Sequence, residues 1–196
     1  MLHVIAFVSG AVLMGLEIVG SRILAPTFGN SIFVWGGLIS VFLAALSAGY
    51  YAGGRLADRR PDAFLLCPIL LIAGGSILLL PVLYPTINNA LFAYDLGPRL
   101  GPLLASALLF PVPAAALGAL PPYLVRLRVE DVSRAGRAAG TVYALSTAGS
   151  IAGTLLTAFA LIPSVGIRAI LFGMGGVLIA LGGVAGIGGR GSEEGR

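Results

Sequence analysis

The sequence contains six long apolar stretches, and their lengths constrain the fold more than any other feature. A helix crosses the ~30 Å hydrocarbon core of a bilayer with about 20 apolar residues. Only 10% of the 196 residues are charged, whereas soluble domains carry about 25% charged residues. The sequence therefore predicts an all-α integral membrane protein, with six transmembrane helices in one domain of residues 1–189. The predicted spans are 2–24, 32–53, 63–83, 101–124, 140–162 and 167–188.

Turn-forming residues separate the predicted spans. Residues 84–102 form the longest predicted loop on one side of the membrane, with room for a short interfacial helix, and residues 126–137 form the longest on the other. Residues 190–196 are polar and rich in glycine, which indicates a disordered tail. The segments LAPTFG (24–29) and LIPSVG (161–166) resemble each other, and we interpret them as two similar turns rather than as an internal repeat.

The distribution of arginine predicts the orientation of the chain. If the spans alternate in direction, nine of the 12 basic residues share one side of the membrane. Only Arg22, Arg99 and Arg168 fall on the other side. Short cytoplasmic loops carry an excess of basic residues, so both termini are predicted to be cytoplasmic. The same loops account for the basic pI of about 9.7, and we predict no nucleic-acid partner.

Small residues at four-residue spacing line one face of the second and the fifth predicted spans. Such faces allow helix backbones to approach closely in lipid, where packing drives helix association. We therefore expect both spans to be buried in a compact bundle. The residues are Ala45, Gly49 and Gly53 in the second span and Gly149, Gly153 and Thr157 in the fifth.

Polar side chains inside the predicted spans are candidates for function. Glu17 lies about 22 Å along a helix that starts near Leu2, at 1.5 Å per residue, and a charge at that depth costs several kcal/mol unless it is paired or hydrated. Glu17 is therefore either a ligand or proton site, or half of a structural hydrogen bond to Ser, Thr or Tyr of the fifth span. The intramembrane candidates are Glu17, Ser21, Arg22, Tyr143, Ser146, Thr147 and Ser150.

A second group of candidates lies at the cytoplasmic end of the second span. Gly54, Asp58 and Arg59 resemble part of the cytoplasmic signature of the major facilitator superfamily, in which Asp and Arg follow a Gly by four residues. The family pattern continues with Gly and a basic residue, whereas this chain has Pro61 and Asp62. A gating latch and a local salt bridge both remain open. The predicted charge cluster is Arg55, Asp58, Arg59, Arg60, Arg126 and Arg128.

The sequence predicts no catalytic, cofactor or metal site. His3 is the only histidine and Cys67 the only cysteine, so neither a histidine-based metal site nor an internal disulfide can form. Residues 186–191 match the spacing G-x-G-x-x-G. A dinucleotide site requires a preceding strand and a following helix, and this match instead follows a membrane span.

Three longer stretches resemble one known family. Residues 15–61, 121–127 and 139–168 are similar to the membrane module of the bacterial fused major-facilitator/spermidine-synthase proteins. The resemblance implies a six-helix half of a major facilitator fold in the bacterial inner membrane. It also implies aminopropyltransferase-type chemistry in an associated cytoplasmic domain or partner, because this chain has no recognisable catalytic domain of its own.

Three functions remain open on these grounds. The chain is a membrane module that anchors or serves a spermidine-synthase-like protein, or a half-size transporter that dimerises to carry polyamines or small cations, or a structural subunit of a larger membrane complex. All three place the chain in a lipid bilayer. A cavity that is lined by Glu17 and open to one side favours transport, whereas a dry interior favours a structural subunit.

Overall fold

The computed structural model describes residues 1–129 and 134–193, with side chains as far as Ile187 in the last helix. These residues are almost entirely helical and contain no strand, which confirms the all-α prediction. A 3-10 helix, η1 (Ala63–Leu65), precedes α3, and a π-helix, η3 (Leu156–Leu161), joins α6 to α7. The α-helices are α1 (Leu2–Phe28), α2 (Ile32–Arg59), α3 (Leu66–Ala93), α4 (Gly97–Leu109), α5 (Pro111–Arg128), α6 (Ala135–Leu155), α7 (Ile162–Ser164) and α8 (Ile167–Glu193).

Most of these helices are long and apolar enough to cross a membrane. Five segments of the described chain pass this test by length and composition. The pair α4 and α5 passes it jointly but is bent by 57°, so the number becomes six if the bent pair is one span. The five single segments are Leu2–Phe28, Ile32–Arg59, Ala63–Ala93, Ala135–Ser164 and Ile167–Ile187.

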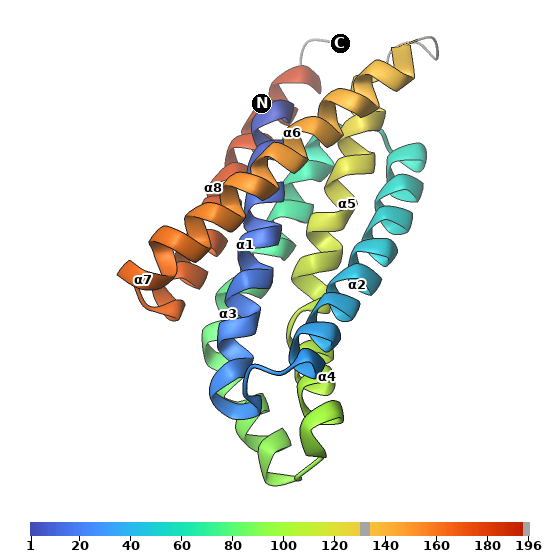
Figure 1. Ribbon diagram of the computed structural model, residues 1–196. Coiled ribbons are helices and arrows are strands. Elements are labelled where there is room, and N and C mark those ends of the chain that lie inside the picture. The colour runs from blue at the N-terminus through green and yellow to red at the C-terminus, as the bar shows by residue number, and fades with distance from the viewer. Residues whose placement is uncertain (130–133, 194–196) are drawn as a thin grey trace.

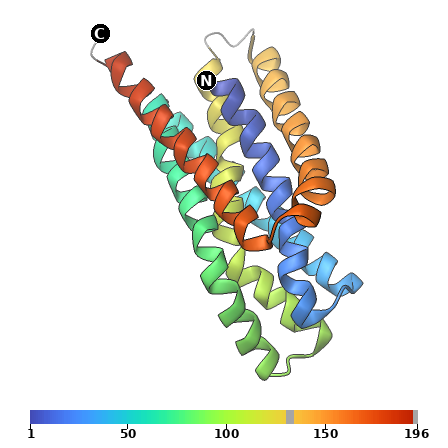
Figure 2. The same ribbon diagram turned by 90° about the vertical axis from the view of Figure 1, so that its left-hand side faces the viewer.

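The helices form an elongated bundle with a common end for both termini (Figure 1). We call this end, which holds Met1 and the last turn of α8, the terminal end. The opposite end, which holds the α1–α2 and α3–α4 connections, is called the distal end (Figure 2), and the α7–α8 connection lies part of the way toward it. Helices α1, α3 and α6 run toward the distal end, and α2, α5 and α8 run back from it.

The fourth predicted span is a broken helix rather than a continuous one. The break lies at Phe110, between α4 and α5. Proline lacks an N–H and its ring clashes with the carbonyl four residues earlier, so Pro111 ends α4, and because it is tolerated in the first turn of a helix it begins α5. Pro121 and Pro122 lie inside α5 and do not end it.

The predicted loop at residues 84–102 is wrong. Helix α3 passes through Pro85 and ends at Ala93. The chain then turns within residues 94–96, where the φ angle of Asp95 is +45° and that of the following Gly97 is +73°. Left-handed residues of this kind reverse the chain in very few residues, so the turn depends on these two positions and not on the prolines.

The boundaries at the terminal end also differ from the predictions. Helix α8 continues to Glu193, so residues 190–193 are helical rather than a disordered tail, and residues 194–196 lie outside the described chain. In the predicted loop 126–137, α5 extends to Arg128 and α6 begins at Ala135. Residues 130–133 of that loop also lie outside the described residues.

Three helix pairs build the bundle: α1 with α6, α2 with α5, and α3 with α8. In the first two pairs, glycines on the predicted small faces touch the partner's backbone, as expected. The spans that carry these faces are nevertheless peripheral, because only 28% of α2 and 17% of Ala135–Ser164 are buried over their most apolar windows. The prediction that both spans are buried in the bundle is therefore wrong, and only their glycine faces are covered.

The glycine contacts of these two pairs correspond to each other in register. A Cβ atom at Gly149 or Gly153 would meet the backbone of α1, at Phe7 and Ala11, and one at Gly49 or Gly53 would meet α5, at Ala115 and Ala119. The α6 positions follow the α2 positions by a constant shift of 100 (49 to 149, 53 to 153), and the α5 positions follow the α1 positions by 108 (7 to 115, 11 to 119). An approximate two-fold axis thus relates the group of helices α1 to α3 to the group α4 to α8.

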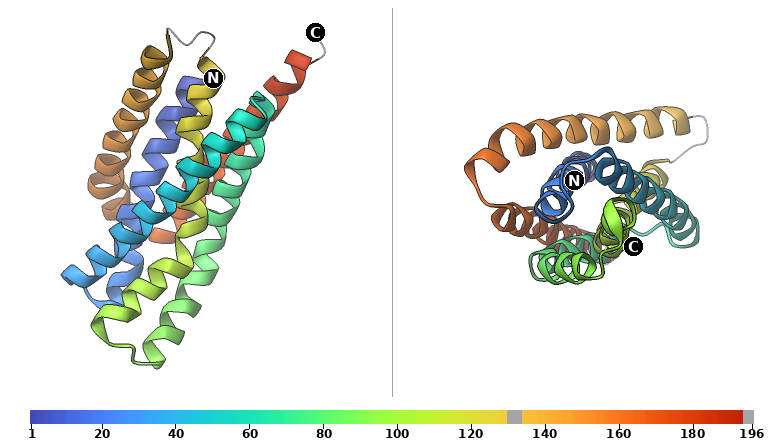
Figure 3. Two further views of the ribbon diagram at one scale, coloured as in Figure 1. Left: turned by 90° about the vertical axis from the view of Figure 1, so that its right-hand side faces the viewer. Right: turned by 60° about the horizontal axis from the view of Figure 1, so that its bottom comes forward.

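The third helix pair, α3 with α8, is related to itself by the same two-fold axis. Gly74 of α3 approaches the carbonyl of Gly175 in α8, and Gly175 in turn approaches the carbonyl of Gly74. Because α1 and α6 run toward the distal end and α2 and α5 run away from it, the two halves are inverted relative to each other (Figure 3). The similar segments 24–29 and 161–166 are not equivalent under these shifts, which agrees with their interpretation as two similar turns.

Candidate functional site

Glu17 lies on α1 at the boundary between α1 and α6. It shares a face of α1 with Gly10, seven residues before it, and with Ser21, four residues after it. Gly10 packs against Ser146 of α6, which places this face of α1 beside α6. The side chain of Glu17 is half-buried. Among the described residues its carboxylate has no hydrogen-bond or ionic partner, so the predicted bond to the fifth span is wrong.

The hydroxyl groups of α6 are directed to backbone carbonyls instead. Ser150 Oγ lies 3.2 Å from the carbonyl oxygen of Gly10 in α1 and 3.0 Å from that of Ser146. Thr154 Oγ1 donates to the carbonyl oxygen of Ser150 at 2.8 Å. The hydroxyl of Ser150 therefore holds α6 to α1, and the backbone of Ser146 packs against Gly10. Both roles are structural, and neither serine is a partner of Glu17.

Exposed polar side chains of α2 and α6 lie nearer the terminal end than Glu17 does, because Gly149 and Gly153 of α6 pack against Phe7 and Ala11 of α1. Tyr143 of α6 is close enough to Tyr50 of α2 for the two to interact electrostatically. Ser47 and Thr147, about one turn further from the terminal end, are also exposed. We call these residues together with Glu17 the polar face: Glu17, Ser47, Tyr50, Tyr143 and Thr147.

The polar face extends to the middle of the bundle. At 1.5 Å per residue, Tyr50 and Tyr143 lie about 13 Å from the terminal ends of their helices, and Glu17 about 22 Å. The sequence identified Glu17, Tyr143 and Thr147 as candidates but not Ser47 and Tyr50. Both are polar residues within the second predicted span and lie outside the glycine face that packs against α5. That position is the feature of the sequence that could have identified them.

The other two intramembrane candidates belong to a separate recess near the distal end. Ser21 and Arg22 line a cavity of about 230 Å³ together with Asn30 and Trp35. Ser21 Oγ donates to the carbonyl oxygen of Ile18 at 2.8 Å, and Trp35 Nε1 donates to Asn30 Oδ1 at 3.1 Å. Arg22 is exposed. The predicted set of seven thus separates into the polar face, the α6 backbone contacts and this recess.

The predicted charge cluster also separates into distinct contacts. Arg126 Nε of α5 lies 3.7 Å from Asp58 Oδ1 of α2, and the two side chains are 46% and 78% exposed. An ion pair this exposed contributes about 0–1 kcal/mol, which is too weak for a latch by itself. Arg55 instead donates to the hydroxyl of Tyr51 at 2.7 Å, and Arg59 and Arg60 are exposed.

Three arginines gather in a recess between α5 and α6 at the terminal end. Arg128, Arg134 and Arg137 line a cavity of about 420 Å³. Arg128 also forms a hydrogen bond with His3 of α1. Among the described residues that line this recess, these three arginines are the charged ones.

The helices and their polar face define the class of this protein: it is a multi-pass, all-α membrane protein whose environment is the lipid bilayer. Comparison with known proteins adds no relative, because no family model, no curated protein and no solved structure matches the chain. Within the described residues, no group of three or more His, Cys, Asp or Glu side chains is placed to hold a metal ion.

Proposed function

We propose that this chain is one half of a two-part membrane carrier, and that a second copy of the chain covers its polar face. The observation that carries the proposal is the polar face itself. Glu17 has no partner among the described residues, and Tyr50 and Tyr143 are 44% and 50% exposed. Such groups are costly against lipid and usually face protein or a water-filled cavity.

The inverted relation between the two groups of helices supports the proposal. Carriers of the major facilitator type contain inverted repeats of three helices within each six-helix half, with the substrate site near the midplane of the membrane. The glycine contacts of this chain have that relation, and counting the bent pair α4–α5 as one span gives six. The polar face lies at a corresponding depth.

The chemistry of the polar face favours a small cation. It contains one carboxylate, two phenols and two aliphatic hydroxyls, and none of its members is basic. Together with the resemblance to spermidine-synthase-associated membrane modules, this points to a polyamine or another small ammonium compound as the solute. The arginine-rich terminal end is then cytoplasmic, in a bacterial inner membrane.

Disulfide cross-linking in native membranes tests the pairing of two copies. In a Cys67→Ala background, Ser47→Cys and Thr147→Cys are expected to link two copies on mild oxidation, because both positions lie on the covered face. Leu79→Cys is the matched control, since Leu79 is 58% exposed and lies on α3, which carries no residue of the polar face. Equal linking at all three positions, or none at the first two, would contradict the pairing.

Flux into proteoliposomes tests the carrier itself. Uptake of radiolabelled butane-1,4-diamine is expected to fall at least about tenfold in Glu17→Gln, because a charge-assisted hydrogen bond contributes about 1.5–3 kcal/mol. Asp58→Asn removes a carboxylate at the terminal end and should keep most of the uptake. Cross-linked copies without diamine flux would reject the carrier and favour the structural subunit.

A second candidate function rests on the positive charge of the terminal end. The recess of Arg128, Arg134 and Arg137, with the exposed Arg59 and Arg60, could dock a spermidine-synthase-like partner, since enzymes that act on polycations often have acidic surfaces. Charge complementarity of this kind steers and orients association. In this reading the chain anchors a cytoplasmic enzyme.

Co-purification at two salt concentrations tests this second function. A variant with Arg128, Arg134 and Arg137 replaced by Gln is expected to lose an acidic cytoplasmic partner, and the wild-type complex should weaken as salt increases. Replacement of Arg99 and Arg168, which lie toward the distal end, is the matched control. Equal recovery of the partner with both variants would rule out docking at the recess.

A further inference from the structure

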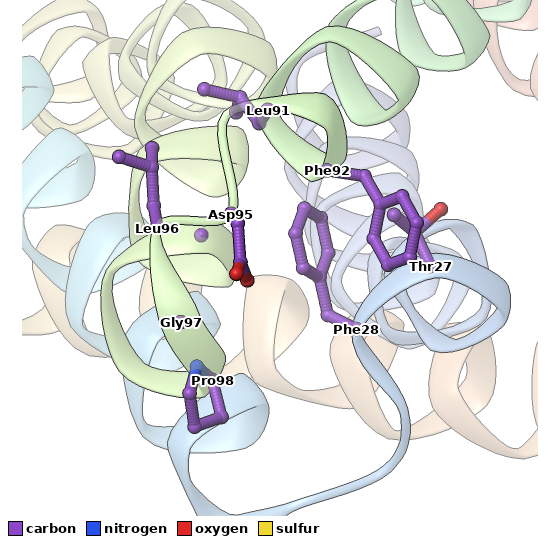
Figure 4. A pocket seen from close by; sticks show the side chains of 9 residues that line it. Thr27, Phe28, Leu91, Phe92, Asp95, Leu96, Gly97 and Pro98 are labelled. Carbon is purple, nitrogen blue, oxygen red and sulfur yellow. The ribbon is translucent and has the colours of Figure 1, made fainter.

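A second recess at the distal end has the chemistry of a site for an organic cation. It lies between the end of α1, the end of α3 and the start of α4, and its volume is about 210 Å³. Phe28, Phe92 and Asp95 are among the residues that line it. Figure 4 shows the carboxylate of Asp95 directed into the recess, with the ring of Phe28 opposite and that of Phe92 beyond.

The lining of this recess is acidic and aromatic, without a compensating cation. None of the residues that line it is basic, and the Asp95 carboxylate has no hydrogen-bond or ionic partner among the described residues. The nearest arginine in the sequence, Arg99, lies over the ring of Phe33 at 5.0 Å from its centroid. Aromatic rings attract cations through their negative faces, so the rings and the carboxylate favour the same kind of ligand.

A buried acceptor lies one helical turn below the recess. Asn88 is 3% exposed, and its Nδ2 donates to the carbonyl oxygen of Ile23 at 2.9 Å. Its Oδ1 is buried and has no hydrogen-bond partner. Leu91 and Thr27, which line the recess, follow Asn88 and Ile23 by about one turn. Asn88 does not line the recess itself, and its buried acceptor marks this end of α3 as polar.

The wall formed by Phe28 is fixed by its packing. A Cβ atom at Gly101 of α4 would lie 2.7 Å from Cε1 of Phe28, so the ring occupies space that only glycine leaves free. The backbone of Asp95 is left-handed, with a φ angle of +45°. Asp and Asn are the residue types, besides Gly, that most readily adopt this conformation.

We propose that this recess binds a primary alkylammonium group. The ammonium donates hydrogen bonds to the carboxylate of Asp95, and the alkyl chain packs against Phe28 and Phe92. The ligand class follows from the lining, which supplies acceptors and aromatic faces but no cation. The proposal does not rest on the proposed carrier function, because the recess and the polar face share no residue.

Calorimetric titration of the full chain in nanodiscs with butylammonium chloride tests the proposal, with empty nanodiscs subtracted as background. Asp95→Asn is expected to weaken binding at least about tenfold, because it removes a charged acceptor and keeps the turn. Phe92→Leu should weaken it about two- to fivefold. The matched control, Asp58→Asn, should bind as the wild type does.

The neutral analogue 1-butanol, which has the same four-carbon chain, separates charge recognition from partition into an apolar recess. We expect it to bind much more weakly than butylammonium and to be insensitive to Asp95→Asn. Equal binding of the two compounds, or unchanged butylammonium binding in Asp95→Asn, would overturn the proposal. Glu17→Gln should bind butylammonium normally even where it loses diamine flux, so failure of this site and failure of the carrier are distinguishable.

Discussion

Replacing Gly153 by valine is expected to destabilise the bundle more than any other single change considered. A Cβ atom at this position would meet the backbone carbonyl and Cα of Ala11 in α1, and backbone cannot move aside as a flexible side chain can. Overpacking of this kind costs about 1–3 kcal/mol or more. For a chain of this length, at about 2–4 °C per kcal/mol, the apparent melting temperature in detergent should fall by roughly 2–12 °C.

Other glycines of the same chain supply the controls. Gly173→Val introduces the same side chain in α8, where nothing lies within 4 Å of the added Cβ, so its melting temperature should stay close to that of the wild type. Gly53→Val, at the position related to Gly153 by the approximate two-fold, should cause a similar loss. If Gly153→Val and Gly173→Val melted at the same temperature, the close approach of α6 to α1 would be disproved.

Tyr123→Phe is expected to have the second largest effect. The ring of Tyr123 is fully buried in α5. Its hydroxyl lies 2.6 Å from the carbonyl oxygen of Arg60 and 2.8 Å from that of Asp62, and it accepts from the Asp62 N–H at 3.2 Å. This single group therefore holds the connection between α2 and η1. Its loss leaves partly buried backbone groups unpaired, at a cost of about 1–3 kcal/mol.

Thermal unfolding and amide hydrogen exchange measure this effect. Tyr123→Phe should lower the melting temperature by several degrees, at roughly 2–4 °C per kcal/mol, and should accelerate exchange of the Asp62 amide. Tyr94→Phe removes the same hydroxyl from a side chain that is 76% exposed and should change neither quantity. Unaltered Asp62 exchange in Tyr123→Phe would show that the hydroxyl does not hold this connection.

Apolar run length and glycine spacing were readable from the sequence because both are local properties. A run of about 20 apolar residues predicts a membrane helix wherever it occurs, and small residues four apart share one helix face. Glu17 was identified for the same reason, since a carboxylate within such a run is costly whatever surrounds it. Which helix a glycine face touches is not local, so the sequence could not assign Gly153 to α1 or Gly53 to α5.

The errors in the boundaries have a related cause. Pro85 and Pro111 are the same residue type in similar apolar surroundings, yet α3 continues through the first and α4 ends before the second. The difference depends on packing around each helix, which offsets the lost N–H in one case and favours a bend in the other. The turn at Asp95 and Gly97 depends on φ angles, which residue type only biases.

The sequence by itself determined that this chain is a helical membrane protein, where most of its spans lie, and that Glu17 is an unusual residue within them. The tertiary structure alone decided what surrounds each polar group. It paired the hydroxyl of Ser150 with the backbone of α1 and left Glu17 without a partner among the described residues. It also paired the Nδ2 of the buried Asn88 with the carbonyl oxygen of Ile23 in α1. Contacts between residues 65 or more positions apart depend on how the helices pack, which no local pattern specifies.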